Sequence, residues 1–301
     1  MKNTLLYYYN VEIEEYTTLN DDIISFYIDY NKFYFIKIKR VKRDIEEIYE
    51  FINKHINKYH FIIKNKYGNI FTEENKSSYI LIKINGPENI EIELNEIIKE
   101  QIPVGSNELE DLKRNNWSNL WSEKVDYLEY QISELGKNHP IILNSFSYYV
   151  GLAENAIEYF NLINGNSSRL VLSQKRLIYP NVSLNNYNPI NLVVDYRVRD
   201  IGEYIKNKFF NNGNALDDIK WLAEKNILSS DEYNLLYARL LYPSYYFDDI
   251  TRIIENKKNE DTLLKFINQV DSYEKFLKST FDIFSTKCSM NKIEWIIKKE
   301  S

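Results

Sequence analysis

The side chains that most often bind metals or act as nucleophiles are few in this sequence and lie far apart. The three histidines are His55, His60 and His139, and the single cysteine is Cys288. Zinc sites need several such ligands at short, characteristic spacings, which these residues do not have. The Gly-x-Ser-x-Gly and Gly-x-Gly-x-x-Gly motifs are also absent. We therefore predict no metal site, and interpret the histidines as helix-surface or turn residues and the cysteine as a small buried hydrophobe.

Charge and hydropathy narrow the classes of protein further. The net charge is −6, so long-range electrostatics do not draw this chain to nucleic acid. The basic run Lys37–Arg43 is followed at once by acidic residues, as at a solvated strand end and helix start. No stretch approaches the roughly 20 apolar residues of a membrane helix, and one cysteine cannot form an internal disulfide. The sequence therefore predicts a cytoplasmic protein whose partners are neither nucleic acid nor membrane.

The first part of the chain has the pattern of short strands around one helix. Phe33–Ile38 is β-branched and aromatic, which predicts a strand. Isoleucine and phenylalanine then recur every three or four residues, which predicts an amphipathic helix over Arg43–Asn57. The turn Lys66-Tyr67-Gly68 lies between the apolar pieces 61–63 and 69–71 and indicates a hairpin.

The pattern becomes mainly helical after about residue 88. Apolar residues from Trp117 to Leu135 step by four and three, and Gly136 ends the run as a helix cap. A second helix is predicted over Tyr149–Ile163. Ser229 and Glu232 form a capping box at the start of a later helix.

The strand-rich pattern of the first part and the helical pattern of the second predict an α+β protein of two lobes. Residues 1–87 form a small lobe with an antiparallel sheet and one helix, and residues 88–301 form a mainly helical lobe. Two short apolar pieces in the second lobe, 170–172 and 192–194, bracket a loop rich in proline and asparagine. Such an arrangement favours a ligand cleft between the lobes.

Several stretches of the second lobe are more specific than this architecture. They are Trp117-Ser118-Asn119-Leu120-Trp121, Ser145–Ile157, Asp195-Tyr196-Arg197-Val198-Arg199-Asp200-Ile201 and Leu241–Phe247. Together they resemble the spore-coat kinase-like family of CotS and YutH. The resemblance implies a bilobal protein-kinase-like fold akin to aminoglycoside and choline phosphotransferases, and an association with bacterial spore formation.

The resemblance also implies which residues would hold a nucleotide. In this fold a lysine on the third strand binds the phosphates, and a glutamate on the next helix positions that lysine. Lys37 can take the first role and Glu47 or Glu50 the second, so Lys37 and Glu50 are the candidate cofactor-binding residues. The alternative is an exposed strand lysine and a carboxylate on a solvated face. No glycine precedes Gly68, so the first strands lack the close-approaching backbone of a phosphate-binding loop.

The expected catalytic loop has lost its base. Related active kinases have His-Gly-Asp or His-Gln-Asp there, followed by an asparagine, and the corresponding residues here are Ser173, Gln174 and Lys175. A lysine ammonium is protonated at pH 7 and can neither accept the proton of an acceptor hydroxyl nor ligate magnesium. Asn181 is a candidate remnant of the metal-binding asparagine, with its register off by one.

The second metal-binding carboxylate is also missing from its expected place. We expect it a few residues before Asp195, where the sequence has Asn188-Pro189-Ile190-Asn191. Asp195 itself matches a structural aspartate of the family motif. Asp200 is predicted to cap the helix that follows it, because a carboxylate accepts from free amide hydrogens there.

We therefore interpret the chain as a catalytically degenerate kinase-like protein, a pseudokinase, that needs no cofactor and acts in sporulation by contact with other spore-coat proteins. Two alternatives stay open: a small-molecule phosphotransferase with an altered site, and a non-catalytic module that binds a small molecule or nucleotide in the cleft. The resemblance implies a place in the mother-cell cytoplasm or the spore coat. Tyrosine is abundant, at 26 residues, so surface tyrosines are candidates for oxidative cross-linking, as in protective coats.

Overall fold

The computed structural model describes residues 1–55, 60–86, 92–163, 168–177 and 186–298. The chain divides into two compact units, one made of residues 1–113 with 172–194 and the other of residues 114–171 with the chain from 195 onward. The predicted boundary at residue 87 falls outside the described residues. No helix in the described ranges is long and apolar enough to cross a membrane.

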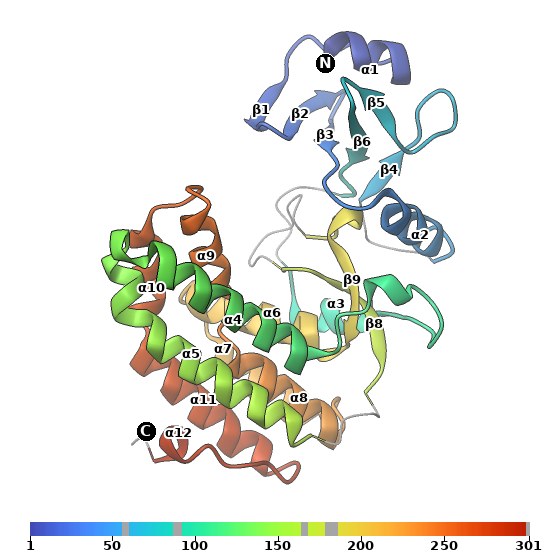
Figure 1. The fold of residues 1–301 in the computed structure, drawn as a ribbon. Helices are drawn as coiled ribbons and strands as arrows, with labels where there is room; N and C mark the ends of the chain where they lie inside the picture. Colours follow the sequence, from blue (N-terminus) through green and yellow to red (C-terminus); the bar gives the residue numbers. More distant parts are fainter. Residues whose placement is uncertain (56–59, 87–91, 164–167, 178–185, 299–301) are drawn as a thin grey trace. The chain divides into compact units, whose positions relative to one another are not determined.

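The first unit is built on an antiparallel sheet (Figure 1). Its strands are β1 (Thr17–Asn20), β2 (Ile23–Ile28), β3 (Asn31–Lys37), β4 (Phe61–Ile63), β5 (Thr72–Glu74) and β6 (Ser77–Lys83). The order is β1-β2-β3-β6-β4, and β5 pairs with β6 beyond this path. Every pairing described between these strands is antiparallel, which confirms the predicted kind of sheet.

Both faces of this sheet are covered. Alternate residues of β3 point to opposite faces, so Tyr34 and Ile36 join one apolar cluster and Phe33 and Phe35 join another. Helix α2 (Lys42–Ile52) packs on the first face through Ile45. Helix α1 (Lys2–Tyr9), which the sequence pattern did not predict, covers the second through its fully buried Leu5.

Two predicted elements of this unit are wrong in detail. Helix α2 ends at Ile52, not at Asn57. Residues 69–71 form no strand, and the predicted hairpin does not exist, because β4 and β5 each pair with β6 and not with each other. The turn between them is held instead by the buried Asn65, whose side chain accepts from the amides of Tyr67 (3.0 Å) and Asn69 (3.2 Å).

A second, three-stranded sheet of order β7-β8-β9 follows. Its strands are β7 (Ile102–Pro103), β8 (Leu170–Gln174) and β9 (Leu192–Tyr196). The short helix α3 (Leu94–Lys99) precedes β7, and a 3-10 turn, Pro189–Asn191, leads into β9. The strands β8 and β9 contain the two predicted apolar pieces, so the candidate catalytic loop begins where β8 ends.

The second unit is helical (Figure 1). Its longer helices are α4 (Trp117–Leu135), α5 (Pro140–Asn161), α6 (Val198–Phe210), α7 (Ala215–Lys225), α8 (Ser230–Leu241), α9 (Ser244–Ile254) and α11 (Val270–Ser285), and the single-turn helices are α10 (Leu264–Ile267) and α12 (Glu294–Ile297). The first of these has the predicted bounds, whereas α5 begins at Pro140 and not at Tyr149. The capping box of Ser229 and Glu232 is present at the start of α8.

Candidate functional site

The candidate phosphate lysine stands at the end of β3. Lys37 is half-buried and lies opposite Tyr79 of β6 in the ladder. Of its two expected partners on α2, Glu47 accepts from Arg43 Nε at 2.8 Å and Glu50 is exposed. No ion pair joins Lys37 to either carboxylate within the ranges that the structure describes. The pairing of Lys37 with a glutamate therefore stays a prediction.

Arg40, which the sequence reasoning missed, connects the start of α2 to the residues before β9. Its Nη1 donates to the carbonyl oxygens of Ile190 (3.1 Å) and Leu192 (2.8 Å), and its Nε donates to Asp44 (3.1 Å). The Asn188 side chain accepts from the amide of Ile190 and shapes the turn. The segment expected to carry a metal-binding carboxylate is thus held by a guanidinium through main-chain oxygens.

The three residues of the candidate catalytic loop point in different directions. Ser173 and Gln174 are buried, whereas the side chain of Lys175 is exposed. Gln174 Oε1 accepts from the amide of Tyr187 at 2.6 Å, and the amide of Lys175 donates to the carbonyl of Asn191 at 2.8 Å. Gln174 therefore connects the end of β8 to Tyr187, whereas the buried Ser173 Oγ has no hydrogen-bond partner among the described residues and the Lys175 side chain lies at the surface. Asn181 lies outside the described residues.

A short chain of hydrogen bonds leads away from Gln174 to the end of β6. The carbonyl of Tyr187 accepts from the amide of His60 at 3.0 Å, and His60 Nδ1 accepts from the amide of Asn85 at 3.1 Å. Tyr187 has φ 58°, a left-handed conformation that costs a non-glycine residue about 1–2 kcal/mol. The expectation that His60 lies on a surface or turn is wrong, because its imidazole is buried in this network.

Replacing Gln174 with alanine is expected to lower the free energy of unfolding by about 1–3 kcal/mol. The change leaves the buried amide of Tyr187 without its acceptor, and an unsatisfied buried donor costs about that much. Urea denaturation of the purified variant measures the loss. The neighbouring Lys175→Ala is the control, and equal stability of the two variants would contradict the structural role of Gln174.

Asp195 is fully buried in the second unit. Its carboxylate accepts from Trp117 Nε1 (2.9 and 3.1 Å) and from the amide of Tyr196 (2.7 Å), and it forms an ion pair with Arg199. Burial raises the pKa of Asp195, while the two arginines nearby, Arg199 and Arg239, act in the opposite direction. Donors from the protein therefore use both oxygens.

Asp200 is not the cap of the following helix. Helix α6 already begins at Val198, so Asp200 lies in its first turn, and the preceding Arg197 provides no side-chain cap. A carboxylate in the first turn still interacts favourably with the helix dipole.

A second buried charge cluster joins α6 to α8. Glu203 Oε1 accepts from Arg239 Nε (3.0 Å) and Nη2 (2.7 Å). Lys206 Nζ lies 3.5 Å from the same carboxylate and donates to Ser244 Oγ at 2.7 Å and to the carbonyl of Tyr242 at 3.2 Å. Its members are almost fully buried. Removal of one member of such a cluster leaves an uncompensated charge in the interior.

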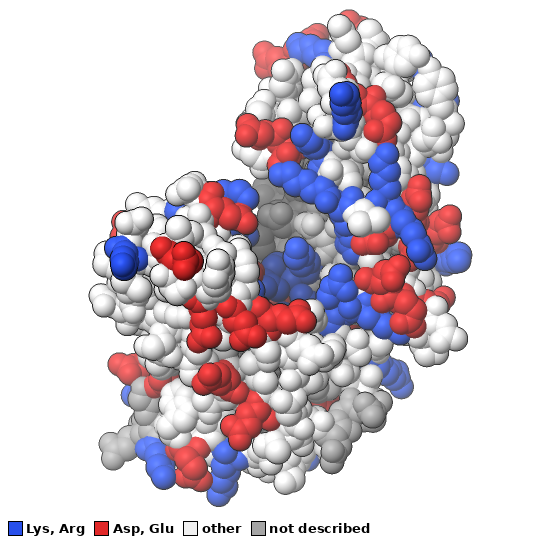
Figure 2. Space-filling view, in the orientation of Figure 1, with Lys and Arg blue, Asp and Glu red and all other residues white. Residues whose placement is uncertain are grey.

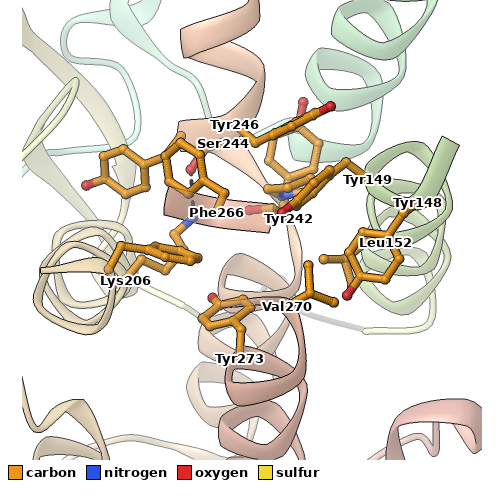
Figure 3. Close-up of a pocket in the computed structure, with 13 residues that line it drawn as sticks. Tyr148, Tyr149, Leu152, Lys206, Tyr242, Ser244, Tyr246, Phe266, Val270 and Tyr273 are labelled. Carbon is orange, nitrogen blue, oxygen red and sulfur yellow. Dashed lines mark hydrogen bonds between the residues drawn. The ribbon is translucent and has the colours of Figure 1, made fainter. Parts of the chain in front are cut away.

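An aromatic cavity lies beside Lys206 (Figure 3). Its volume is about 20 Å³, which is enough for about one water molecule. Two of the phenols around it are hydrogen-bonded to other groups: Tyr148 donates to Glu274 (2.7 Å) and Tyr273 to the carbonyl of Leu240 (2.8 Å). Tyr149 is buried and stacks on Tyr246 with ring centroids 3.6 Å apart. This cavity is therefore part of an aromatic core and is too small for a sugar or a nucleotide.

The remaining candidates for chemistry are dispersed. His55 Nδ1 lies 2.9 Å from the carbonyl of Phe51, and His139 Nδ1 lies 3.9 Å from Glu260. Within the described part of the chain, no group of three histidine, cysteine or acidic side chains could hold a metal ion.

Acidic side chains run along α4 on the face drawn in Figure 2.

Cys288 is half-buried and not fully buried as predicted. Asn234 Nδ2 donates to its sulfur at 3.6 Å, and burial raises the pKa of the thiol. We expect alkylation by iodoacetamide at pH 7.5 to be slower than that of an unfolded cysteine peptide, because the thiolate is the reactive form. Mass spectrometry of timed samples measures the rate, with the urea-unfolded protein as the control. Equal rates in the folded and unfolded protein would contradict the prediction.

Comparison with solved structures defines the class of protein. An aminoglycoside phosphotransferase from Alicyclobacillus acidocaldarius matches with a TM-score of 0.63 and 11% identity, over 92% of this chain and 94% of that one. Spectinomycin phosphotransferase APH(9)-Ia, in complex with ADP and spectinomycin, matches with a TM-score of 0.62 and 12% identity, over 94% and 97% of the two chains. The fold is therefore that of the aminoglycoside phosphotransferases, which confirms the predicted kinase-like class.

Sequence comparison identifies the family within that class. Residues 2–280 match the family described as "Spore coat putative kinase YutH", and the chain belongs to this family. The endospore coat-associated protein YutH of Bacillus subtilis (strain 168) is 25% identical over 211 residues. That match spans 62% of this chain and 62% of the length of the relative. The family resemblance of the sequence motifs is confirmed.

Proposed function

We propose that this chain is a kinase-fold protein that transfers no phosphoryl group and acts in spore formation by binding other spore-coat proteins. The observation that carries the proposal is the exposed Lys175 at the position expected for the catalytic aspartate. Phosphoryl transfer needs a carboxylate to accept the proton of the acceptor hydroxyl. An ammonium at that point repels the proton and the Mg²⁺ ion that the reaction requires.

Three further features support the proposal. The two residues before Lys175 are buried, and Gln174 holds the amide of Tyr187. Ile190 before β9 and Leu192 at its start supply main-chain oxygens to Arg40. The next carboxylate along the chain, Asp195, already accepts from Trp117 and Arg199. Among the described residues, the positions expected for the base and for the metal carboxylate thus have another task or another charge.

Replacing Lys175 with alanine is expected to change the free energy of unfolding by no more than about 0.5 kcal/mol, since exposed substitutions away from special features cost little. It is also expected to leave spore-coat assembly intact. Chemical denaturation and coat-protein extraction from sporulating cells measure the two. The proposal of a catalytically inactive protein would be contradicted if the wild type transferred a phosphoryl group from ATP to an acceptor and Lys175→Ala abolished that transfer without changing the free energy of unfolding.

A second candidate function is nucleotide binding without transfer. Lys37 is half-buried at the end of β3, where this fold places its phosphate lysine, and APH(9)-Ia was solved with ADP. A thermal-shift titration with ATP and ADP, with and without Mg²⁺, separates the two candidates. A ligand that binds only the folded state raises the free energy of unfolding by about 2.7 kcal/mol when its concentration is a hundred times its dissociation constant. We expect no Mg²⁺-dependent shift; a shift that Lys37→Ala removes would favour the second candidate.

The family supports a proposal for the partners of this chain and for its place in the cell. The relative from Bacillus subtilis is an endospore coat-associated protein. The partners we propose are therefore coat proteins, which this chain would first bind in the mother cell. Crosslinking in sporulating cells, followed by mass spectrometry of proteins bound to the tagged chain, tests this. Recovery of coat proteins supports the proposal, and their absence while the tagged chain is abundant in vegetative cytoplasm contradicts it.

A further inference from the structure

Two exposed tyrosines of the first unit are hydrogen-bonded to each other through their phenol groups. Tyr67 Oη donates to Tyr7 Oη at 3.0 Å, and the ring centroids lie 6.3 Å apart with 49° between the ring planes. Tyr7 is 57% exposed and Tyr67 is 56% exposed. Sixty residues separate them in sequence, so the tertiary structure alone brings them together.

The backbone on both sides of this pair is held firmly. Tyr7 lies on α1, which the fully buried Leu5 fastens to the sheet. The turn that carries Tyr67 is closed by the buried Asn65, and the amide of Lys66 donates to the carbonyl of Tyr8 at 2.8 Å. The fold therefore fixes the two Cα positions, and both rings lie at the surface.

Other pairs of close tyrosine rings are either buried or have phenol groups that are not hydrogen-bonded to each other. Tyr149 and Tyr246 stack at 3.6 Å but are buried, and Tyr246 is hydrogen-bonded to Ser145. Tyr8 lies against Tyr7, yet its phenol donates to the carbonyl of Glu73 at 3.3 Å. Tyr7 and Tyr67 combine exposure to an oxidant with phenol oxygens in contact.

We propose that Tyr7 and Tyr67 are an intramolecular oxidative cross-linking site, at which a haem peroxidase with hydrogen peroxide forms a dityrosine bond. Each phenol loses one electron and one proton to give a tyrosyl radical. The two radicals form a carbon–carbon bond between the ring positions ortho to the oxygens, and the hydrogens on those carbons move to the oxygens and restore two phenols. One hydrogen peroxide accepts the two electrons and two protons and becomes two water molecules.

The local charges are compatible with this chemistry. The hydrogen bond with Tyr67 is the main cause of the raised pKa of Tyr7, which favours the protonated phenol of Tyr7. Lys66 Nζ lies 4.1 Å from the centroid of the Tyr7 ring. The bond would tie α1 covalently to the turn before β5 and so prevent α1 from separating from the sheet.

The test uses the full chain at low concentration, horseradish peroxidase and limiting hydrogen peroxide. Trypsin cuts after Lys66, so Tyr67 is the one tyrosine of the peptide 67–76, whereas Tyr7 lies in the peptide 3–32. We expect these two peptides to appear joined, with two hydrogens less than their summed mass, in protein that stays monomeric on a denaturing gel. Dityrosine fluorescence should rise with the joined peptide, and the unfolding temperature of the treated protein should rise.

Matched variants distinguish the pair from general tyrosine oxidation. Tyr7→Phe and Tyr67→Phe should each remove the joined peptide. Tyr30→Phe, at a fully exposed tyrosine with no phenol bonded to it among the described residues, should leave its yield unchanged. Circular dichroism checks that the three variants fold alike. Cross-links that are mainly intermolecular would overturn the proposal. So would a joined peptide that persists in Tyr7→Phe, because Tyr67 would then couple to another tyrosine of the peptide 3–32, such as Tyr8, whose ring centroid lies 6.1 Å from that of Tyr67.

Discussion

Replacing Glu203 with alanine is expected to lower the free energy of unfolding by about 3–5 kcal/mol, one of the largest losses that a single substitution in this chain can produce. The carboxylate is fully buried and compensates two buried cations, Arg239 at 2.7 Å and Lys206 at 3.5 Å. Removal of one partner leaves an uncompensated charge in the interior, and breaking a buried ion pair in this way typically costs that much. Urea denaturation followed by circular dichroism measures the loss.

Two comparisons show whether the charge itself is responsible. Glu203→Gln keeps an acceptor for Arg239 but removes the negative charge, so its loss should be intermediate. Asp282→Ala removes a carboxylate from an exposed pair with Lys278 (2.9 Å) and should cost no more than about 1 kcal/mol. A Glu203→Ala protein as stable as Asp282→Ala would show that α6 and α8 do not depend on this cluster.

Replacing Asp195 with alanine should be similarly damaging, again by about 3–5 kcal/mol. The change removes the carboxylate that forms the ion pair with the buried Arg199 and that accepts from Trp117 Nε1. Thermal unfolding of the purified variant measures the effect, and a variant that is insoluble at 37 °C but folded at lower temperature agrees with it.

The Asp195 variants also separate a structural carboxylate from a metal ligand. Asp195→Asn preserves the shape and one acceptor oxygen, and a structural role predicts that it recovers part of the stability lost in the alanine variant. A carboxylate used to hold Mg²⁺ would behave differently: Asp195→Asn would keep full stability and lose Mg²⁺-dependent nucleotide binding. That second pattern would contradict the structural role and revive the altered-enzyme alternative.

The sequence predicted those elements whose pattern depends on residues close together in the chain. The helix Trp117–Leu135 has the predicted bounds because one of its faces is buried and the other exposed, which gives a clear helical period. The capping box of Ser229 and Glu232 was also predictable, because its hydrogen bonds join residues three apart. The strand piece Phe33–Ile38 was recognisable from its composition, since the sheet is covered on both faces.

Other elements depended on contacts between residues distant in sequence. Helix α1 has a weak period of its own and is held by Leu5 against the sheet, so its sequence gave little sign of it. Strands β4 and β5 each pair with β6, which comes after both of them in the sequence. A hairpin signal in the turn could not reveal this, because it describes only the residues next to the turn.

The sequence by itself predicts that the base and the metal carboxylate are missing from the positions where the family motif is expected, because this comparison needs only the identity of the residues. The tertiary structure decided what the replacements do instead. Gln174 could be a buried acceptor or an exposed amide, and only its 2.6 Å contact with the amide of Tyr187 assigns it to the interior. The same holds for Tyr7 and Tyr67, since the free energy that brings their phenols together comes from packing α1 and the Asn65 turn on the sheet.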